Sequence, residues 1–275
     1  MARVEVDGVG LFYEAGGDGD PLVLVHGSWG DHHNWDAVVH GLALRHRVLV
    51  YDRRGHSESD RPEGQGTRRE DEDDLAGLLK TLGFAPAFVA GNSFGASVTL
   101  GLASRRPELF RGIVVHEPTL MDLVAGMPAY EEQMAQARRR LGRVVELLRE
   151  GDALAGARTF VEEVAFGPGA WEQMPQRLRD TYVTNAPTFL DEQGDPDWAG
   201  LDLAALSAGD VPALVTRGTE SPAWFGVVVD RVAGALSGVR THVFEGAGHI
   251  PHVTHPEEYV ELVTRFCAEH GAGRA

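Results

Sequence analysis

The chain has one cysteine in 275 residues, Cys267, and no long hydrophobic run. A single thiol excludes an intramolecular disulfide, and we expect this residue to be a small core side chain. No stretch approaches the roughly 20 apolar residues needed to cross a bilayer. The first residues also lack the apolar region and the cleavage site of a secretory signal, so we expect a cytoplasmic protein without a membrane partner.

Basic residues are also scarce. Lysine and arginine number 25 against 41 aspartates and glutamates, which gives a formal net charge of −16. Such a surface repels phosphate backbones and anionic lipid, so we expect no nucleic-acid partner. The expected partner is a small-molecule substrate, bound by a monomer or a homodimer. A length of 275 residues with 43% hydrophobic residues fits one α/β domain that carries an insertion.

Short apolar runs indicate the strands of a sheet. Asp7-Gly8 separates two apolar segments near the start and predicts a hairpin turn. The next runs show no period-2 alternation, which is typical of parallel strands covered on both faces. These runs are Leu22–Val25, Val48–Tyr51, Ala87–Ala90 and Ile113–Val115. Segments with helical periodicity lie between them, and this alternation predicts βαβ units and a parallel sheet.

The alternation stops after the sixth predicted strand. From about 120 to 206 the sequence shows helical periodicity without a convincing strand, and strands return at Ala213–Thr216 and Thr241–Phe244. We therefore predict an α/β fold with a mostly parallel eight-stranded sheet and helices on both faces, formed by residues 1–119 and 207–275. An all-helical cap, residues 120–206, is expected to cover the carboxyl ends of the strands, where open α/β sheets bind ligands.

The segment Gly91-Asn92-Ser93-Phe94-Gly95 matches the pattern G-x-S-x-G. A predicted strand precedes it and a predicted helix follows it, as in a nucleophile elbow. The serine of such an elbow occupies a sharp, strained turn, where side chains in place of the glycines would collide with neighbouring backbone. Free N–H groups at the start of the helix also favour developing negative charge. We predict that Ser93 is a nucleophile.

A nucleophilic serine needs a base, and the chain has 12 histidines. His249 lies in FEGAGHIPHVTHPEEY, between the last predicted strand and the last helix, at the same sheet edge as the elbow. The chain order serine, acid, histidine is the order that this architecture uses, so His249 is the predicted base. His252 and His255 follow at a spacing of three. Because no cysteine or carboxylate cluster completes a ligand set, we predict no metal site there.

Four segments together resemble the α/β-hydrolase superfamily over essentially the whole chain. They are LVLVHGSWGDHHNW (22–35), YDRRGHSES (51–59), the elbow (91–95) and GAGHIPHVTHPEEYVELVTRF (246–266). The resemblance implies an oxyanion hole formed by two backbone N–H groups, those of Ser28 and Phe94. It also implies chemistry through an acyl-enzyme, without a metal or an organic cofactor.

The acid of the implied triad departs from the family pattern. Most members carry an aspartate after the seventh strand, and in TRGTESPAW Ser221 occupies that place. Glu220 lies one residue early, so its side chain would leave the turn in another direction. Glu117 directly follows the sixth strand, where some relatives carry the acid, and its extra methylene suits the longer reach. We favour Glu117, with Glu220, an acid elsewhere or no acid at all as alternatives, and expect Asp52 to be structural.

These residues predict a hydrolase that cleaves a carboxylic ester or lactone with Ser93, His249 and Glu117 as its triad. The substrate is expected to be small to medium-sized and moderately apolar, in a pocket walled by aromatic side chains. The aromatic residues expected there are Trp29, Trp171, Tyr182 and Phe189. Two alternatives stay open. GNSFGA is similar to the elbow of carbon–carbon bond hydrolases that act on ring-fission products, and some relatives are ligand receptors or non-hydrolytic catalysts.

Overall fold

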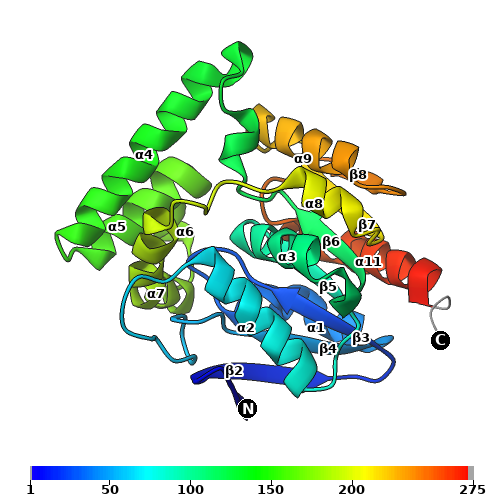
Figure 1. Ribbon diagram of the computed structural model, residues 1–275. Helices are drawn as coiled ribbons and strands as arrows, with labels where there is room; N and C mark the ends of the chain where they lie inside the picture. The colour runs from blue at the N-terminus through cyan, green and yellow to red at the C-terminus, as the bar shows by residue number, and fades with distance from the viewer. Residues whose placement is uncertain (1, 272–275) are drawn as a thin grey trace.

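An eight-stranded sheet runs through the centre of the computed structural model, which describes residues 2–271 (Figure 1). The strand order is β1-β2-β4-β3-β5-β6-β7-β8. The pairs β1–β2 and β2–β4 are antiparallel and the other pairs are parallel. The strands are β1 Ala2–Val6, β2 Val9–Gly16, β3 Asp20–Val25, β4 His46–Tyr51, β5 Ala87–Asn92, β6 Phe110–His116, β7 Ala213–Gly218 and β8 Arg240–Phe244.

Helices cover both faces of this sheet and bury a separate hydrophobic core on each. On one face lie α2, α3, α8 and α9, and on the other lie α1 and α11. These helices are α1 Asp36–Ala43, α2 Arg68–Thr81, α3 Phe94–Arg105, α8 Leu203–Ala208, α9 Ala223–Ala235 and α11 Pro256–Gly271. The predicted fold, a mostly parallel eight-stranded sheet between helices, is confirmed.

The central strands are buried along most of their length because both faces are covered. In β5 every residue is buried, and in β3 the last four residues are buried. This explains why the sequence shows continuous apolar runs there in place of alternation. Cys267 is fully buried in the core beneath α11, as expected of a small core side chain. No helix within residues 2–271 is both long and apolar enough to cross a bilayer.

The segment between β6 and β7 is helical throughout its regular elements. Figure 1 shows α4, α5, α6 and α7 gathered beyond the ends of the strands, to one side of the sheet. The elements of this segment are η3 Met121–Val124, η4 Pro128–Tyr130, α4 Glu131–Arg149, α5 Ala153–Thr159, η5 Phe160–Ala165, α6 Ala170–Gln173 and α7 Gln176–Gly194, before α8. The cap boundaries 120 and 206 stay a prediction. The second falls inside α8, which packs on α3 of the sheet layer.

Helices α4 to α7 have a small hydrophobic core of their own. Their apolar side chains pack around Trp29, which the loop after β3 inserts among them. Trp29 is fully buried and stacks on Phe160 at 4.8 Å and on Tyr182 at 6.0 Å between ring centroids. This tryptophan therefore joins the helical segment to the sheet layer next to the elbow.

Candidate active site

Ser93 occupies the turn between β5 and α3 with φ 58° and ψ −124°. This backbone conformation is strained for a residue with a side chain. A Cβ on Gly91 would collide with the carbonyl of Gly95, and a Cβ on Gly95 would collide with the carbonyl of Val25. The glycines are therefore required by close backbone contacts on both sides of the serine. The turn has the geometry expected of a nucleophile elbow.

The loop after β3 passes directly over this turn. A Cβ added to Gly27 would lie 3.0 Å from the Cβ of Ser93, which is a tight contact, so the loop and the turn are closely packed here. Ser28 and Phe94, the predicted oxyanion-hole residues, line the same cavity as Ser93. Phe94 is the first residue of α3, where backbone N–H groups lack partners within the helix. The structure thus places the two predicted oxyanion-hole residues beside the candidate nucleophile.

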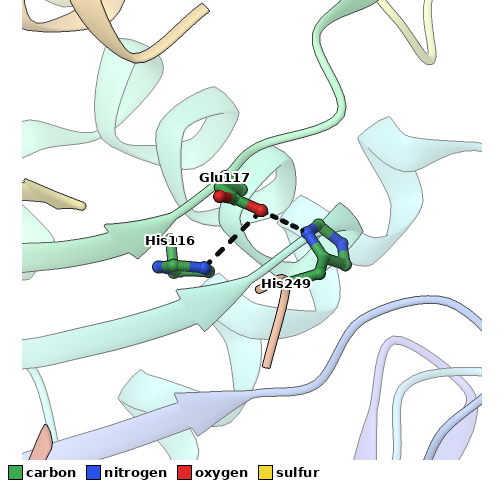
Figure 2. Close-up of side chains that lie close together, drawn as sticks. All are labelled: His116, Glu117 and His249. Atoms are coloured by element: carbon green, nitrogen blue, oxygen red, sulfur yellow. Dashed lines mark hydrogen bonds and ion pairs between the residues drawn. The ribbon is translucent and has the colours of Figure 1, made fainter. Parts of the chain in front are cut away.

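Glu117 and His249 meet next to the elbow. Figure 2 shows the carboxylate directed at the imidazole, and His249 Nδ1 donates a hydrogen bond of 2.7 Å to Glu117 Oε2. Ser221 Oγ donates to the same oxygen at 2.8 Å, and the N–H of Gly218 donates to Oε1 at 2.8 Å. Both carboxylate oxygens therefore have donors, and the position of the imidazole is determined by a buried acceptor.

The ionisation of Glu117 is controlled by these contacts. The residue is fully buried, and burial by itself opposes ionisation. The hydrogen bond and the charge of His249 outweigh this burial and lower the pKa of Glu117 to about 2. Its backbone has φ 44°, an uncommon conformation that lies directly after β6. An ionised carboxylate is thus held against His249.

His116 lies on the other side of Glu117 (Figure 2). Its Nε2 is 3.6 Å from Glu117 Oε2, and its Nδ1 shares a hydrogen bond of 2.9 Å with Thr216 Oγ1. Burial lowers the pKa of His116 to about 4, so the ring is neutral at pH 7. It is a neutral neighbour of the carboxylate, whereas His249 is hydrogen-bonded to it.

His116, Glu117 and His249 also lie close enough to be considered as metal ligands. One ligating atom from each lies within 4.8 Å of the others among the described residues. The carboxylate oxygens, however, already accept hydrogen bonds from three donors, including the N–H of Gly218. A bound cation would have to displace these donors. The arrangement therefore suits a hydrogen-bonded acid better than a metal ligand.

The other acids and histidines considered in the sequence lie elsewhere. Glu220 is exposed, and within residues 2–271 only its backbone N–H makes a hydrogen bond, to the carbonyl of Ala247. Asp52 accepts hydrogen bonds from the backbone N–H and the ring of His32, as expected of a structural residue. His252 is buried against Trp35, with ring centroids 4.5 Å apart. Of the two glutamates weighed as the acid, only Glu117 contacts His249.

A cavity of about 360 Å³ opens above Ser93 and His249. Of the four aromatic residues predicted to wall a pocket, Phe189 lines this cavity. Trp29, Trp171 and Tyr182 do not line it, because their side chains fill the hydrophobic core between α4 and α7. The prediction that these three residues form the pocket wall is therefore wrong. They belong to the hydrophobic core that packs behind the lining residues Phe160 and Phe189.

Several lining residues were missed in the sequence. Thr119 and Met121 follow β6, and Trp224 and Phe225 begin α9 after β7. Phe225 packs against the ring of His249, with centroids 4.9 Å apart. Their position directly after the carboxyl ends of strands was the available signal. The helical segment adds Gln133, Gln136, Ala137, Arg140, Leu141, Phe160, Val164, Ala165, Glu192, Gln193 and Trp198.

A buried ionic cluster of Arg53, Asp71 and Glu192 connects α7 to the loop that carries Ser28. Glu192 of α7 accepts hydrogen bonds from Ser28 Oγ at 2.6 Å and from Arg53 Nη2 at 2.7 Å. Arg53 also pairs with Asp71 of α2 at 2.8 Å and lies over the ring of Phe94. Burial raises the pKa of Asp71 to about 7, and burial also raises the pKa of Glu192. No sequence pattern pointed to this cluster.

Comparison with known proteins identifies the family to which the chain belongs. The profile described as the alpha/beta hydrolase family matches residues 22–262. A 2-hydroxymuconate semialdehyde hydrolase from Pseudomonas sp. (strain CF600) is 28% identical over 93% of this chain and 89% of its own length. An uncharacterized hydrolase, YraK from Bacillus subtilis, is 38% identical over 45% of this chain and 46% of its own length.

Among solved structures, Est816, described as an N-acyl homoserine lactone degrading enzyme, superimposes with a TM-score of 0.74. It is 25% identical, and the match covers 96% of this chain and 100% of that one. Because the family profile matches most of the chain, including the elbow and His249, the protein is a member of the alpha/beta hydrolase family.

Proposed function

We propose that this protein hydrolyses a carboxylic ester or a lactone through an acyl-enzyme formed on Ser93. The observation that carries the proposal is the 2.7 Å hydrogen bond between the buried Glu117 carboxylate and His249, in the cavity that Ser93 also lines. A serine in a strained elbow, a histidine and an ionised acid form the constellation used for acyl transfer. Residues 120–206 act in this proposal as the cap above the cavity.

In the proposed reaction Ser93 Oγ attacks the substrate carbonyl carbon while His249 Nε2 accepts its proton. Glu117 accepts the hydrogen bond from Nδ1, which fixes the tautomer and stabilises the imidazolium. The backbone N–H groups of Ser28 and Phe94 bind the oxyanion. His249 then gives the proton to the leaving alcohol, and water activated by His249 releases the carboxylic acid.

The proposal requires Ser93 Oγ to come within hydrogen-bond distance of the His249 ring. Within residues 2–271 no hydrogen bond joins Ser93 Oγ to His249, although both side chains line one cavity. In enzymes without substrate this contact is often long, and it shortens when substrate binds. All proposed steps use side chains, backbone N–H groups and water, so they require no metal and no organic cofactor.

The apolar lining supports a moderately apolar substrate. Met121, Leu141, Trp224 and Phe225 are among the side chains that face the cavity. Est816, described as degrading N-acyl homoserine lactones, supports a lactone among the candidate substrates. A carbon–carbon bond hydrolase is the second candidate, and it is favoured by the 2-hydroxymuconate semialdehyde hydrolase relative, which matches over 93% of this chain. Product analysis with an ester and with a ring-fission product separates the two.

Labelling with a fluorophosphonate tests the proposed nucleophile. We expect one equivalent to attach to Ser93, with complete loss of labelling and of ester turnover in Ser93→Ala. Ser104→Ala is the matched control, because Ser104 lies at the far end of α3 and its hydroxyl donates to the carbonyl of Gly101 in the same helix. Addition of EDTA should leave the rate unchanged. The proposal is contradicted if the intact wild-type protein does not become labelled, or if labelling persists in Ser93→Ala.

A further inference from the structure

The face of α4 that lines the cavity bears polar side chains at its rim. Gln133, Gln136, Ala137, Arg140 and Leu141 all line the cavity. They follow the spacing i, i+3, i+4, i+7 and i+8, which places them on one face of a helix. Both glutamines and Arg140 are exposed, so they lie at the mouth of the cavity. The deeper lining, closer to α9, is largely apolar.

Arg140 is the unpaired cation of this cavity. The charged or titratable side chains in its lining are Arg140, Glu192 and His249. Glu192 is already hydrogen-bonded to Arg53 and Ser28, and His249 to Glu117. Among residues 2–271, no carboxylate oxygen lies within 4.0 Å of the Arg140 guanidinium. This differs from Arg143, one turn further along α4, which pairs with Glu163.

We propose that Arg140 binds a carboxylate of the substrate, so that the preferred substrate is an anionic ester or lactone. The inference rests on the proposed hydrolase function of the same cavity. A guanidinium presents a planar fork of N–H donors that fits a carboxylate in a bidentate manner. The side-chain amides of Gln133 and Gln136 supply further donors at the same rim.

The geometry orients such a substrate. Its reactive carbonyl lies at Ser93, its apolar body lies against Met121, Trp224 and Phe225, and its carboxylate reaches the α4 rim. A protein with a net charge of −16 repels anions in general. A cation placed at the mouth of the cavity is therefore needed if an anionic substrate is to be selected over a neutral one of the same shape. Arg140 supplies that selection.

The test compares two substrates of equal shape. One is the aryl monoester of glutaric acid, and the other is its counterpart with a terminal carboxamide in place of the carboxylate. Wild type should prefer the anionic ester. In Arg140→Gln the ratio of their kcat/KM values should fall by about 10- to 100-fold, the loss expected for a charged hydrogen bond. Arg139→Gln is the matched control, since Arg139 is exposed on α4 but does not line the cavity.

A binding measurement separates this inference from the hydrolase proposal. In a Ser93→Ala background, calorimetry with glutaric acid monoanilide, which carries a free carboxylate, should show a Kd that Arg140→Gln weakens by the same factor. If neither ester is turned over but this binding difference is present, the hydrolase proposal fails and the carboxylate site stands. If Arg140→Gln changes neither the ratio nor the Kd, or if Arg139→Gln changes them equally, the inference is wrong.

Discussion

At the scale of single residues, Glu117 is held by three donors from two other segments, the end of β7 with the loop after it and the loop after β8. His249 Nδ1, Ser221 Oγ and the N–H of Gly218 all reach its carboxylate. Ser221 stands where the family pattern has its acid, and here its hydroxyl donates to the carboxylate from β6. The proposed acid therefore follows β6, whereas the family pattern has its acid after β7. The longer side chain of glutamate bridges the distance to His249.

Replacing Glu117 with glutamine tests this assignment. Glutamine has nearly the same shape but cannot balance the charge of an imidazolium, and it favours the wrong tautomer of His249. We expect kcat to fall by about 10⁴-fold, as observed when the acid of a comparable triad is made neutral. Steady-state kinetics with an aryl ester, together with circular dichroism to verify folding, measure the effect.

Glu220→Gln is the control for that substitution. The Glu220 side chain is exposed, and in the described part of the chain the residue is hydrogen-bonded through its backbone alone. The activity of the variant should therefore remain at the wild-type level. If the rate of Glu117→Gln is near normal and the rate of Glu220→Gln falls by orders of magnitude, the assignment is wrong and Glu220, in the loop after β7, is the acid.

At the scale of elements, α7 is joined to the sheet layer by buried polar contacts. Asn185 Nδ2 donates to the carbonyl of Gly30 at 2.8 Å, and its Oδ1 accepts from the N–H of Ser57 at 2.7 Å. Glu192, two turns along the helix, bonds to Ser28 and Arg53. The roof of the cavity and the loop that carries the proposed oxyanion donor are therefore positioned by the same helix.

Arg53 connects α2 and α7 by pairing with Asp71 and Glu192. Arg53→Met leaves the carboxylates of Asp71 and Glu192 buried without their cation. We expect the free energy of unfolding to fall by about 3–5 kcal/mol, the usual cost of breaking a buried ion pair from one side. Urea denaturation at pH 8, above the pKa of about 7 of Asp71, measures this loss.

The control for Arg53 is an exposed ion pair. Arg3 pairs with Asp60 at 2.8 Å, and both side chains are about half exposed, so Arg3→Met should cost less than about 1 kcal/mol. Equal, small losses in Arg3→Met and Arg53→Met would show that the buried cluster does not hold α7 and α2 in place.

At the scale of the whole molecule, the free energy of unfolding depends on pH through buried carboxylates whose pKa values are shifted in opposite directions. Glu117 has a pKa lowered to about 2, because its contacts with His249 outweigh burial. Asp71 has a pKa raised to about 7, because burial outweighs its pairing with Arg53. A lowered pKa stabilises the fold above the ordinary value of the group, whereas a raised one lowers stability as pH increases. The two residues therefore act in opposite directions.

For Glu117 the direction in which stability changes with pH can be tested. Its folded pKa of about 2 lies below the ordinary 4.5, so its contribution is complete above pH 4.5 and is lost as pH falls toward 2. The difference in unfolding free energy between wild type and Glu117→Gln should shrink by about 2 kcal/mol between pH 6 and pH 3. Denaturant titrations of both proteins at each pH give this difference. A difference that stays constant over the range would contradict the assigned shift.

The sequence by itself determined the order of strands and helices, the elbow at Ser93 and the candidate base His249. These features depend on local properties: apolar runs of strand length, glycines required by a tight turn, and the position of a loop after a strand. The β5 strand and the start of α3 therefore agree closely with the prediction. The sequence also favoured Glu117 over Glu220 by their places after β6 and β7, and it left an acid elsewhere in the chain open.

Only the tertiary structure decided which acid meets the base and which side chains line the cavity. Glu117 and His249 are 132 residues apart, and Ser28 and Glu192 are 164 residues apart, so no local pattern relates them. Aromatic side chains such as Trp171 suit a core and a pocket wall equally well, and composition cannot separate the two. Packing in three dimensions places Trp171 in the core of the helical segment and Arg140 at the mouth of the cavity, because burial and contact are properties of the folded chain.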